Sequence, residues 1–187
     1  MNNKLDKIIE RFGDFTNGYR LLMLTHRSKD GVSDKDRKVI KRISTNSDDF
    51  KKLLNELLII KHESHLPYRI YSSVNSRNIK KAIRIFKQNQ LNADYDNEEN
   101  RNHFYSDIKN RWISALMQPQ SKAESNFLID IDEGDNLKEA ITVLSTITRN
   151  VFKYKTKNGH HLITEPFNPE RMNGWEIKKD GLILLDY

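Results

Sequence analysis

Residues 127–132, Phe127-Leu128-Ile129-Asp130-Ile131-Asp132, form an apolar run that ends in two carboxylates. A short run of this kind, bounded by polar residues, is typical of a buried strand. Side chains two residues apart on a strand point to the same face, so Asp130 and Asp132 project together. We therefore expect a core strand that presents two neighbouring carboxylates on one surface.

The residues after this strand predict one helix and three more strands. Leu137, Ala140, Ile141 and Leu144 recur at helical spacing, which indicates the helix. Lys157-Asn158-Gly159 is a turn signal between two strand-like segments and predicts a hairpin. The predicted strands are residues 151–155, 160–164 and 182–187, and the last of them follows the segment 175–179 and a turn signal at Asp180-Gly181.

The residues before this strand are expected to be mostly helical. Apolar spacing predicts a helix from Phe50 to Leu58, a strand over 68–74 and a helix from Ile79, and one long helix over 97–117 that ends before Pro119. The run 19–25 fits a strand or a buried helix. The sequence thus predicts a single α+β domain: residues 1–118 form an N-terminal helical and α/β unit, and residues 119–187 form a core with a mixed or antiparallel sheet.

Composition restricts the possible classes of protein. The chain has 187 residues, with 32 Lys and Arg against 26 Asp and Glu, which gives a formal charge of +6. This excess permits phosphate-bearing partners without requiring them. The absence of cysteine excludes disulfides, thiolate metal sites and a cysteine nucleophile. The most apolar windows are far shorter than the roughly 20 residues that span a bilayer, so we expect a cytoplasmic protein without membrane contact.

Three features could carry chemistry. Asp130 and Asp132 could hold a divalent cation such as Mg²⁺ or Mn²⁺, because hard oxygen ligands suit hard ions. The alternative is a strand that simply ends in a solvated acidic loop. Two histidines, His160 and His161, follow the predicted turn, and each could equally be a surface or packing residue. Asp186 ends the last apolar run, where an acid is also ordinary.

The order of these features is more specific than any one of them. An apolar strand with Asp-x-Asp (Asp130, Asp132) is followed by Thr156-x-x-Gly159-x-His161 and then by an apolar strand that ends in Asp186. This order resembles the catalytic core of the archaeo-eukaryotic primase superfamily, the primase-polymerases. The resemblance covers mainly residues 126–187 and implies a sheet core like that of the RNA-recognition motif.

The resemblance also implies roles for individual residues. Asp130, Asp132 and Asp186 would be catalytic and would hold one or two Mg²⁺ or Mn²⁺ ions, which bridge the triphosphate and the attacking hydroxyl in nucleotidyl transfer. His161 would contact the triphosphate of the incoming nucleotide. Thr156, Lys155 and Lys157 lie in or beside the same turn and would be further phosphate partners, although most lysines of a basic chain are solvated surface charge.

Three functional hypotheses follow. The first is a metal-dependent nucleotidyltransferase of the primase-polymerase type, an enzyme that uses nucleoside triphosphates on a single-stranded nucleic acid template, with other replication proteins as partners in a bacterial or viral setting. The second is a catalytically inactive module that binds nucleotide or nucleic acid, which is suggested by the end of the sequence one residue after Asp186. The third is a metal-dependent nuclease, because three carboxylates and a histidine also suit hydrolysis.

Overall fold

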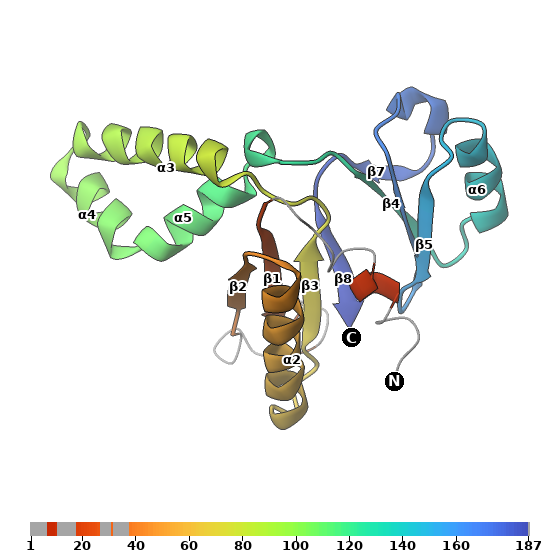
Figure 1. The fold of residues 1–187 in the computed structure, drawn as a ribbon, viewed down its shortest axis with the longest axis horizontal. Helices are drawn as coiled ribbons and strands as arrows, with labels where there is room; N and C mark the ends of the chain where they lie inside the picture. The colour runs from red at the N-terminus through yellow and green to blue at the C-terminus, as the bar shows by residue number, and fades with distance from the viewer. Residues whose placement is uncertain (1–6, 11–17, 27–30, 32–37, 187) are drawn as a thin grey trace.

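The protein is built on two antiparallel sheets of four strands each. The computed structural model describes residues 7–10, 18–26, 31 and 38–186, and these contain strands β1–β8 and helices α2–α6 (Figure 1). Within this part of the chain, no helix is long and apolar enough to cross a membrane. The α+β class predicted from the sequence is confirmed.

The N-terminal sheet has the strand order β2-β1-β3-β8. Its strands are β1 (Arg20–Thr25), β2 (Ile40–Ser44), β3 (Arg69–Ser73) and β8 (Leu182–Asp186). Helix α2 (Ser47–Glu63) begins at Asn46, whose side chain accepts a hydrogen bond from the backbone N–H of Asp49. Its apolar side packs on one face of the sheet in a cluster that includes Leu54 and Leu22.

The C-terminal sheet has the strand order β5-β6-β4-β7. Its strands are β4 (Phe127–Asp132), β5 (Val151–Lys155), β6 (Gly159–Thr164) and β7 (Glu176–Lys178). Helix α6 (Leu137–Ser145) and the short helix η4 (Pro169–Met172) pack on its outer face, where Ile129 and Ile131 are fully or almost fully buried. The hairpin predicted around the Lys157-Asn158-Gly159 turn is confirmed.

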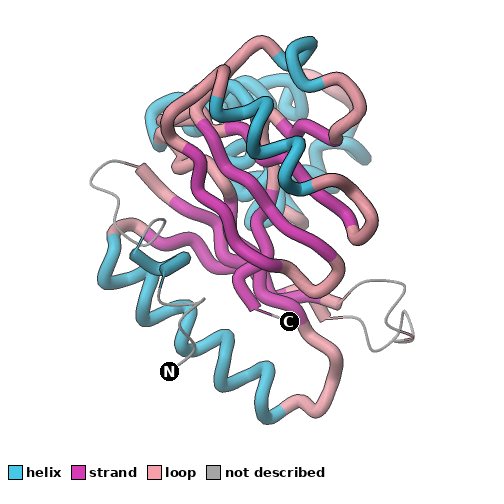
Figure 2. The backbone as a smooth tube through the Cα atoms, turned by 90° about the vertical axis from the view of Figure 1, so that its right-hand side faces the viewer, coloured by secondary structure: helices cyan, strands magenta, loops and turns pink. Residues whose placement is uncertain are grey.

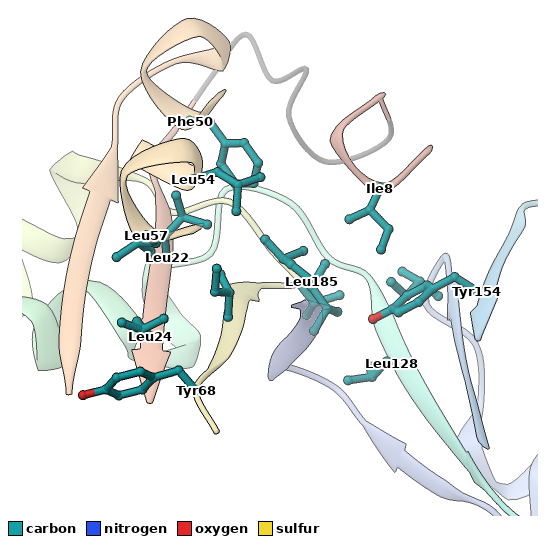
Figure 3. Close-up of a cluster of buried hydrophobic side chains, with 14 residues drawn as sticks. Ile8, Leu22, Leu24, Phe50, Leu54, Leu57, Tyr68, Leu128, Tyr154 and Leu185 are labelled. Atoms are coloured by element: carbon teal, nitrogen blue, oxygen red, sulfur yellow. The ribbon is translucent and has the colours of Figure 1, made fainter. Parts of the chain in front are cut away.

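The other face of β4 turns toward the N-terminal sheet. Leu128 belongs to a continuous core that also contains Tyr154 from β5 and Leu185 from β8 (Figure 3). Because side chains alternate along a strand, Asp130 and Asp132 lie on the same face as Leu128. In Figure 2 the strands occupy the middle of the molecule, with helices outside them. Asp130 is partly buried and Asp132 is exposed, and both line a pocket that also contains residues of β3 and β8 from the N-terminal sheet.

The last strand does not belong to the C-terminal sheet. The sequence groups residues 182–187 with the core of residues 119–187, but β8 pairs antiparallel with β3. The physical reason is burial, because Ile183 and Leu185 pack into the core under α2. The chain therefore returns to the N-terminal sheet, and the two units share one core.

A helical arm extends from the N-terminal sheet (Figure 1). It consists of α3 (Ile79–Asp94), α4 (Glu98–Ser106) and α5 (Ile108–Met117), followed by the short helix η3 (Pro119–Ser121). The single helix predicted over residues 97–117 is wrong, because the chain breaks at Asp107, where φ is −118° and ψ is 27°. The break lets α5 fold back along α3, and Trp112 meets Phe86 with ring centroids 5.7 Å apart.

Candidate active site between the two sheets

A polar pocket of about 480 Å³ lies between the two sheets. The C-terminal sheet supplies most of its polar side chains, and the N-terminal sheet closes it with Arg69 and Tyr71 from β3 and two leucines from β8. The lining residues are Arg69, Tyr71, Asp130, Asp132, Thr156, Lys157, Asn158, His161, Glu176, Lys178, Leu182 and Leu184. Five of the residues expected from the sequence therefore line one pocket: Asp130, Asp132, Thr156, Lys157 and His161.

Sheet register brings the central groups together. Asp130 on β4 lies directly opposite His161 on β6 and opposite Glu176 on β7. Directly opposed residues of antiparallel strands point to the same face. His161 Nε2 lies 3.3 Å from Asp130 Oδ1, and Lys178 Nζ lies 3.1 Å from Asp130 Oδ2. Both carboxylate oxygens of Asp130 are thus engaged.

Tyr154 orients the imidazole of His161 from behind. Its hydroxyl lies 2.6 Å from His161 Nδ1, and both side chains are buried. The ionised carboxylate of Asp130 can only accept a hydrogen bond, so Nε2 of His161 is the donor to Asp130 and Nδ1 is the atom that contacts the phenol. Burial and the charge of Asp130 raise the pKa of Tyr154, which keeps the phenol protonated. His161 is therefore held in one orientation facing Asp130.

The electrostatics favour an ionised Asp130. The hydrogen bond from His161 outweighs partial burial and, together with Lys178, lowers the pKa of Asp130 to about 2. Lys178 also lies 3.3 Å from Glu176, and its pKa is raised because the two carboxylates outweigh the effect of burial. The ammonium group of Lys178 thus occupies the position of a counter-cation between two acids.

The turn before β6 requires glycine. Thr156 N–H donates to the carbonyl of Gly159 at 2.9 Å, which closes the turn. A Cβ atom on Gly159 would overlap the carbonyl oxygen of Ile131 on β4. Asp132 lies opposite Gly159 in the register, so this close approach of the two strands lies beside an Asp-x-Asp carboxylate. The Thr-x-x-Gly-x-His pattern therefore has a local steric cause in this fold.

The pocket carries both signs of charge in equal number. Its lining has three cations, Arg69, Lys157 and Lys178, and three carboxylates, Asp130, Asp132 and Glu176. Asp130 and Asp132 offer hard oxygen donors from the same face of one strand, which suits Mg²⁺ or Mn²⁺. In the described residues, however, no group of three or more His, Asp or Glu side chains is drawn together as a metal cluster. A divalent cation would have to replace the ammonium group of Lys178 beside Asp130.

Two of the expected residues lie outside the pocket lining. Lys155 is exposed at the end of β5. Asp186 is paired with Lys61 of α2, at 2.6 Å between Oδ2 and Nζ. A β-bulge explains this placement: Tyr71 pairs with Leu184 and Ile70 pairs with Asp186, so Leu185 is an extra residue in β8. In a regular strand, Asp186 would lie on the pocket face together with Leu184. Because of the bulge, Asp186 lies on the opposite face, which is the face of Ile70.

The sequence did not identify several residues of the pocket as candidates, namely Arg69, Tyr71, Asn158, Glu176 and Lys178. Glu176 and Lys178 are two residues apart in the segment before the predicted turn at Asp180-Gly181, so a strand there would have implied a shared face. Their position beside Asp130 could not have been inferred, because it depends on which strands are neighbours.

Comparison with known proteins identifies no relative. We found no match for this chain among protein-family models, curated proteins or solved structures. The geometry of the pocket therefore carries the functional argument.

Proposed function

We propose that this protein binds a nucleoside triphosphate with Mg²⁺ or Mn²⁺ in the pocket between the sheets, and that it is a metal-dependent nucleotidyltransferase of the primase-polymerase type, acting on a nucleic acid template. The observation that carries the proposal is the cross-strand pairing of Asp130 with His161, with Asp132 and the Thr156–Asn158 turn at the same pocket. The two motifs are distant in sequence and share one surface.

Each part of the pocket suits one part of such a ligand. Asp130 and Asp132 would hold the divalent cation, which supplies charge neutralisation for the triphosphate and polarises the attacking hydroxyl. Lys157 and His161 provide cationic and N–H groups for the phosphate oxygens, and Lys178 can turn from Asp130 to a phosphate. Phosphoryl chemistry depends mainly on positioning and charge, which a rigid cross-strand arrangement provides.

Calorimetry tests the binding step of this proposal. Wild-type protein should bind a nucleoside triphosphate in the presence of Mn²⁺, and Asp130→Asn combined with Asp132→Asn should abolish that binding. Glu133→Gln combined with Asp135→Asn is the matched control, because it removes the same charge from the loop that follows β4 and outside the pocket lining. Binding that is unaffected by loss of Asp130 and Asp132 would overturn the proposal.

A second candidate function is nucleotide binding without transfer. The observation that favours it is the ion pair between Asp186 and Lys61, which leaves Asp186 outside the pocket. Incubation with a labelled template, primer and all nucleoside triphosphates separates the candidates. Extension or new primers support the transferase, binding without synthesis supports the second candidate, and degradation of the labelled strand supports a nuclease.

A further inference from the structure

A second cavity lies between the edge strand of the N-terminal sheet and the helical arm. It has a volume of about 550 Å³ and is lined by Val39 and Ile40–Arg42 on one side and by Lys109, Asn110 and Ile113 on the other. Among the described residues, strand β2 is an edge strand with β1 as its one neighbour (Figure 1). We call this surface the β2–α5 groove.

The groove is basic, and its described lining holds no acid to balance its cations. Its lining contains three cations, Lys41, Arg42 and Lys109, and no carboxylate. Lys41 and Arg42 are only partly exposed, yet neither they nor Lys109 forms an ion pair with any described residue. The carboxylate nearest along α5, Asp107, accepts a hydrogen bond from Asn110 at 2.6 Å.

Three other cations of the fold, which are buried or mostly buried, form ion pairs with acids. Arg20 pairs with Glu124, Lys61 with Asp186, and Arg77 with Asp180. Partly buried charge without a partner is unfavourable, since desolvation is not compensated. Lys41 and Arg42 are partly buried and Lys109 is exposed, and none of the three pairs with an acid among the described residues, so an anionic ligand in the groove would stabilise this charge.

The apolar side chains of the groove indicate what kind of anion it would bind. Val39 is 46% exposed, and Ile40 and Ile113 add apolar surface to the same groove. A ligand that carries both phosphates and exposed apolar base faces matches both kinds of surface, and an unpaired nucleic acid strand is such a ligand. Its bases would meet aliphatic side chains here, because the described lining includes no aromatic residue. A duplex keeps its bases stacked inside, so it would present mainly its sugar–phosphate backbone to these apolar side chains.

We infer that the β2–α5 groove binds single-stranded nucleic acid, with Lys41, Arg42 and Lys109 contacting phosphates. The inference rests on the proposed function for the role of that strand as the template, and it places the strand on a surface separate from the nucleotide pocket. Cations of β2, at the sheet edge, and of α5, in the helical arm, would then contact the same nucleic acid strand.

The test is the salt dependence of binding to fluorescent dT20 and U20 strands. Each phosphate contact contributes about 0.7 to the slope of log K against log salt for single strands. Replacing Lys41, Arg42 and Lys109 together with glutamine should lower the magnitude of that slope by about 2 and weaken binding at least tenfold at low salt. Lys109→Gln alone, an exposed change on a helix, should lower it by about 0.7 and guards against misfolding of the triple variant.

The matched control replaces Lys138, Arg149 and Lys153 with glutamine. These are two lysines and one arginine, all exposed in the C-terminal unit, so the change in net charge is identical. An equal loss of affinity in groove and control variants would show a nonspecific charge effect and overturn the inference. Tighter binding to a duplex of the same length would also overturn the inference. So would a wild-type protein that binds an acidic peptide through these cations but binds neither dT20 nor U20.

Failure of this inference is distinguishable from failure of the proposed function. The groove variant should bind the Mn²⁺–nucleotide normally, and the Asp130→Asn, Asp132→Asn variant should bind dT20 normally. Oligonucleotide binding that depends on Asp130 and Asp132 and not on the groove cations would overturn the groove while leaving the pocket proposal intact.

Discussion

Lys61 and Asp186 form an ion pair on the α2 side of the N-terminal sheet, with 2.6 Å between Nζ and Oδ2. Both side chains are mostly buried, at 15% and 27% exposure. The bulge at Leu185 turns Asp186 toward α2, so the last strand of the chain is joined to the helix that covers its sheet.

Asp186→Asn should therefore lower the free energy of unfolding. Loss of the pair leaves the ammonium group of Lys61 without its acid, which we expect to cost roughly 1 to 2 kcal/mol and to lower the melting temperature by about 3 to 6 °C. Mn²⁺–nucleotide binding should stay unchanged, because Asp186 is not in the pocket lining. Calorimetric melting and titration of the same sample measure both effects. Loss of nucleotide binding in a variant of normal stability would instead place Asp186 at the metal.

Lys178→Met should strengthen binding of a divalent cation. The ammonium group lies 3.1 Å from Asp130 and 3.3 Å from Glu176, where it competes with any added cation. Its removal should tighten Mn²⁺ binding on the order of tenfold, measured without nucleotide by electron paramagnetic resonance. Lys179→Met is the control, since Lys179 is exposed and outside the pocket lining. Unchanged or weaker Mn²⁺ binding in Lys178→Met would contradict this role.

Gly159→Ala should damage both the fold and the site. The new Cβ would overlap the carbonyl oxygen of Ile131, so β4 and β6 would have to separate beside Asp132. We expect a loss of roughly 2 to 4 kcal/mol in the free energy of unfolding, together with weaker nucleotide binding. Gly181→Ala is the matched control, because a Cβ there meets its nearest neighbour at an ordinary 3.7 Å. Equal stability of the two variants in urea titrations would refute the steric argument.

Stability in acid should depend on Asp130. Its pKa is lowered to about 2 in the folded protein, from an ordinary value of 3.8. A lowered carboxyl pKa stabilises the fold at pH values above the ordinary pKa, and this contribution is lost as the pH falls through the folded-state value. The difference in unfolding free energy between wild type and Asp130→Asn should therefore shrink by roughly 1 to 2 kcal/mol between pH 5 and pH 2. A difference that does not change with pH would contradict the pairing of Asp130 with His161 and Lys178.

The local sequence pattern predicted the helices and strands better than it predicted which of them are neighbours in the fold. The strand over 127–132, the hairpin around Gly159 and the helix over Leu137–Leu144 were predicted because each depends on spacing within one segment. The break at Asp107 was missed because the apolar spacing continues across it. What bends the chain there is the packing of α5 against α3, a contact between distant segments.

The candidate site divides in the same way. Sequence alone determined that Asp130 and Asp132 share a face, since strand alternation is a local property. Sequence order also suggested that His161 belongs with them, and the register confirms that the three line one pocket. Glu176 and Lys178 join them only because β7 is the neighbour of β4 on its other side.

Only the tertiary structure decided the position of Asp186. By strand alternation it would point with Leu182 and Leu184 into the pocket, but one extra residue in β8 reverses its direction. Leu185 is buried in the shared core, in one cluster with residues more than 100 positions away such as Leu22 and Phe50. Local periodicity therefore determined which residues can share a face, whereas long-range burial decided which face each of them occupies.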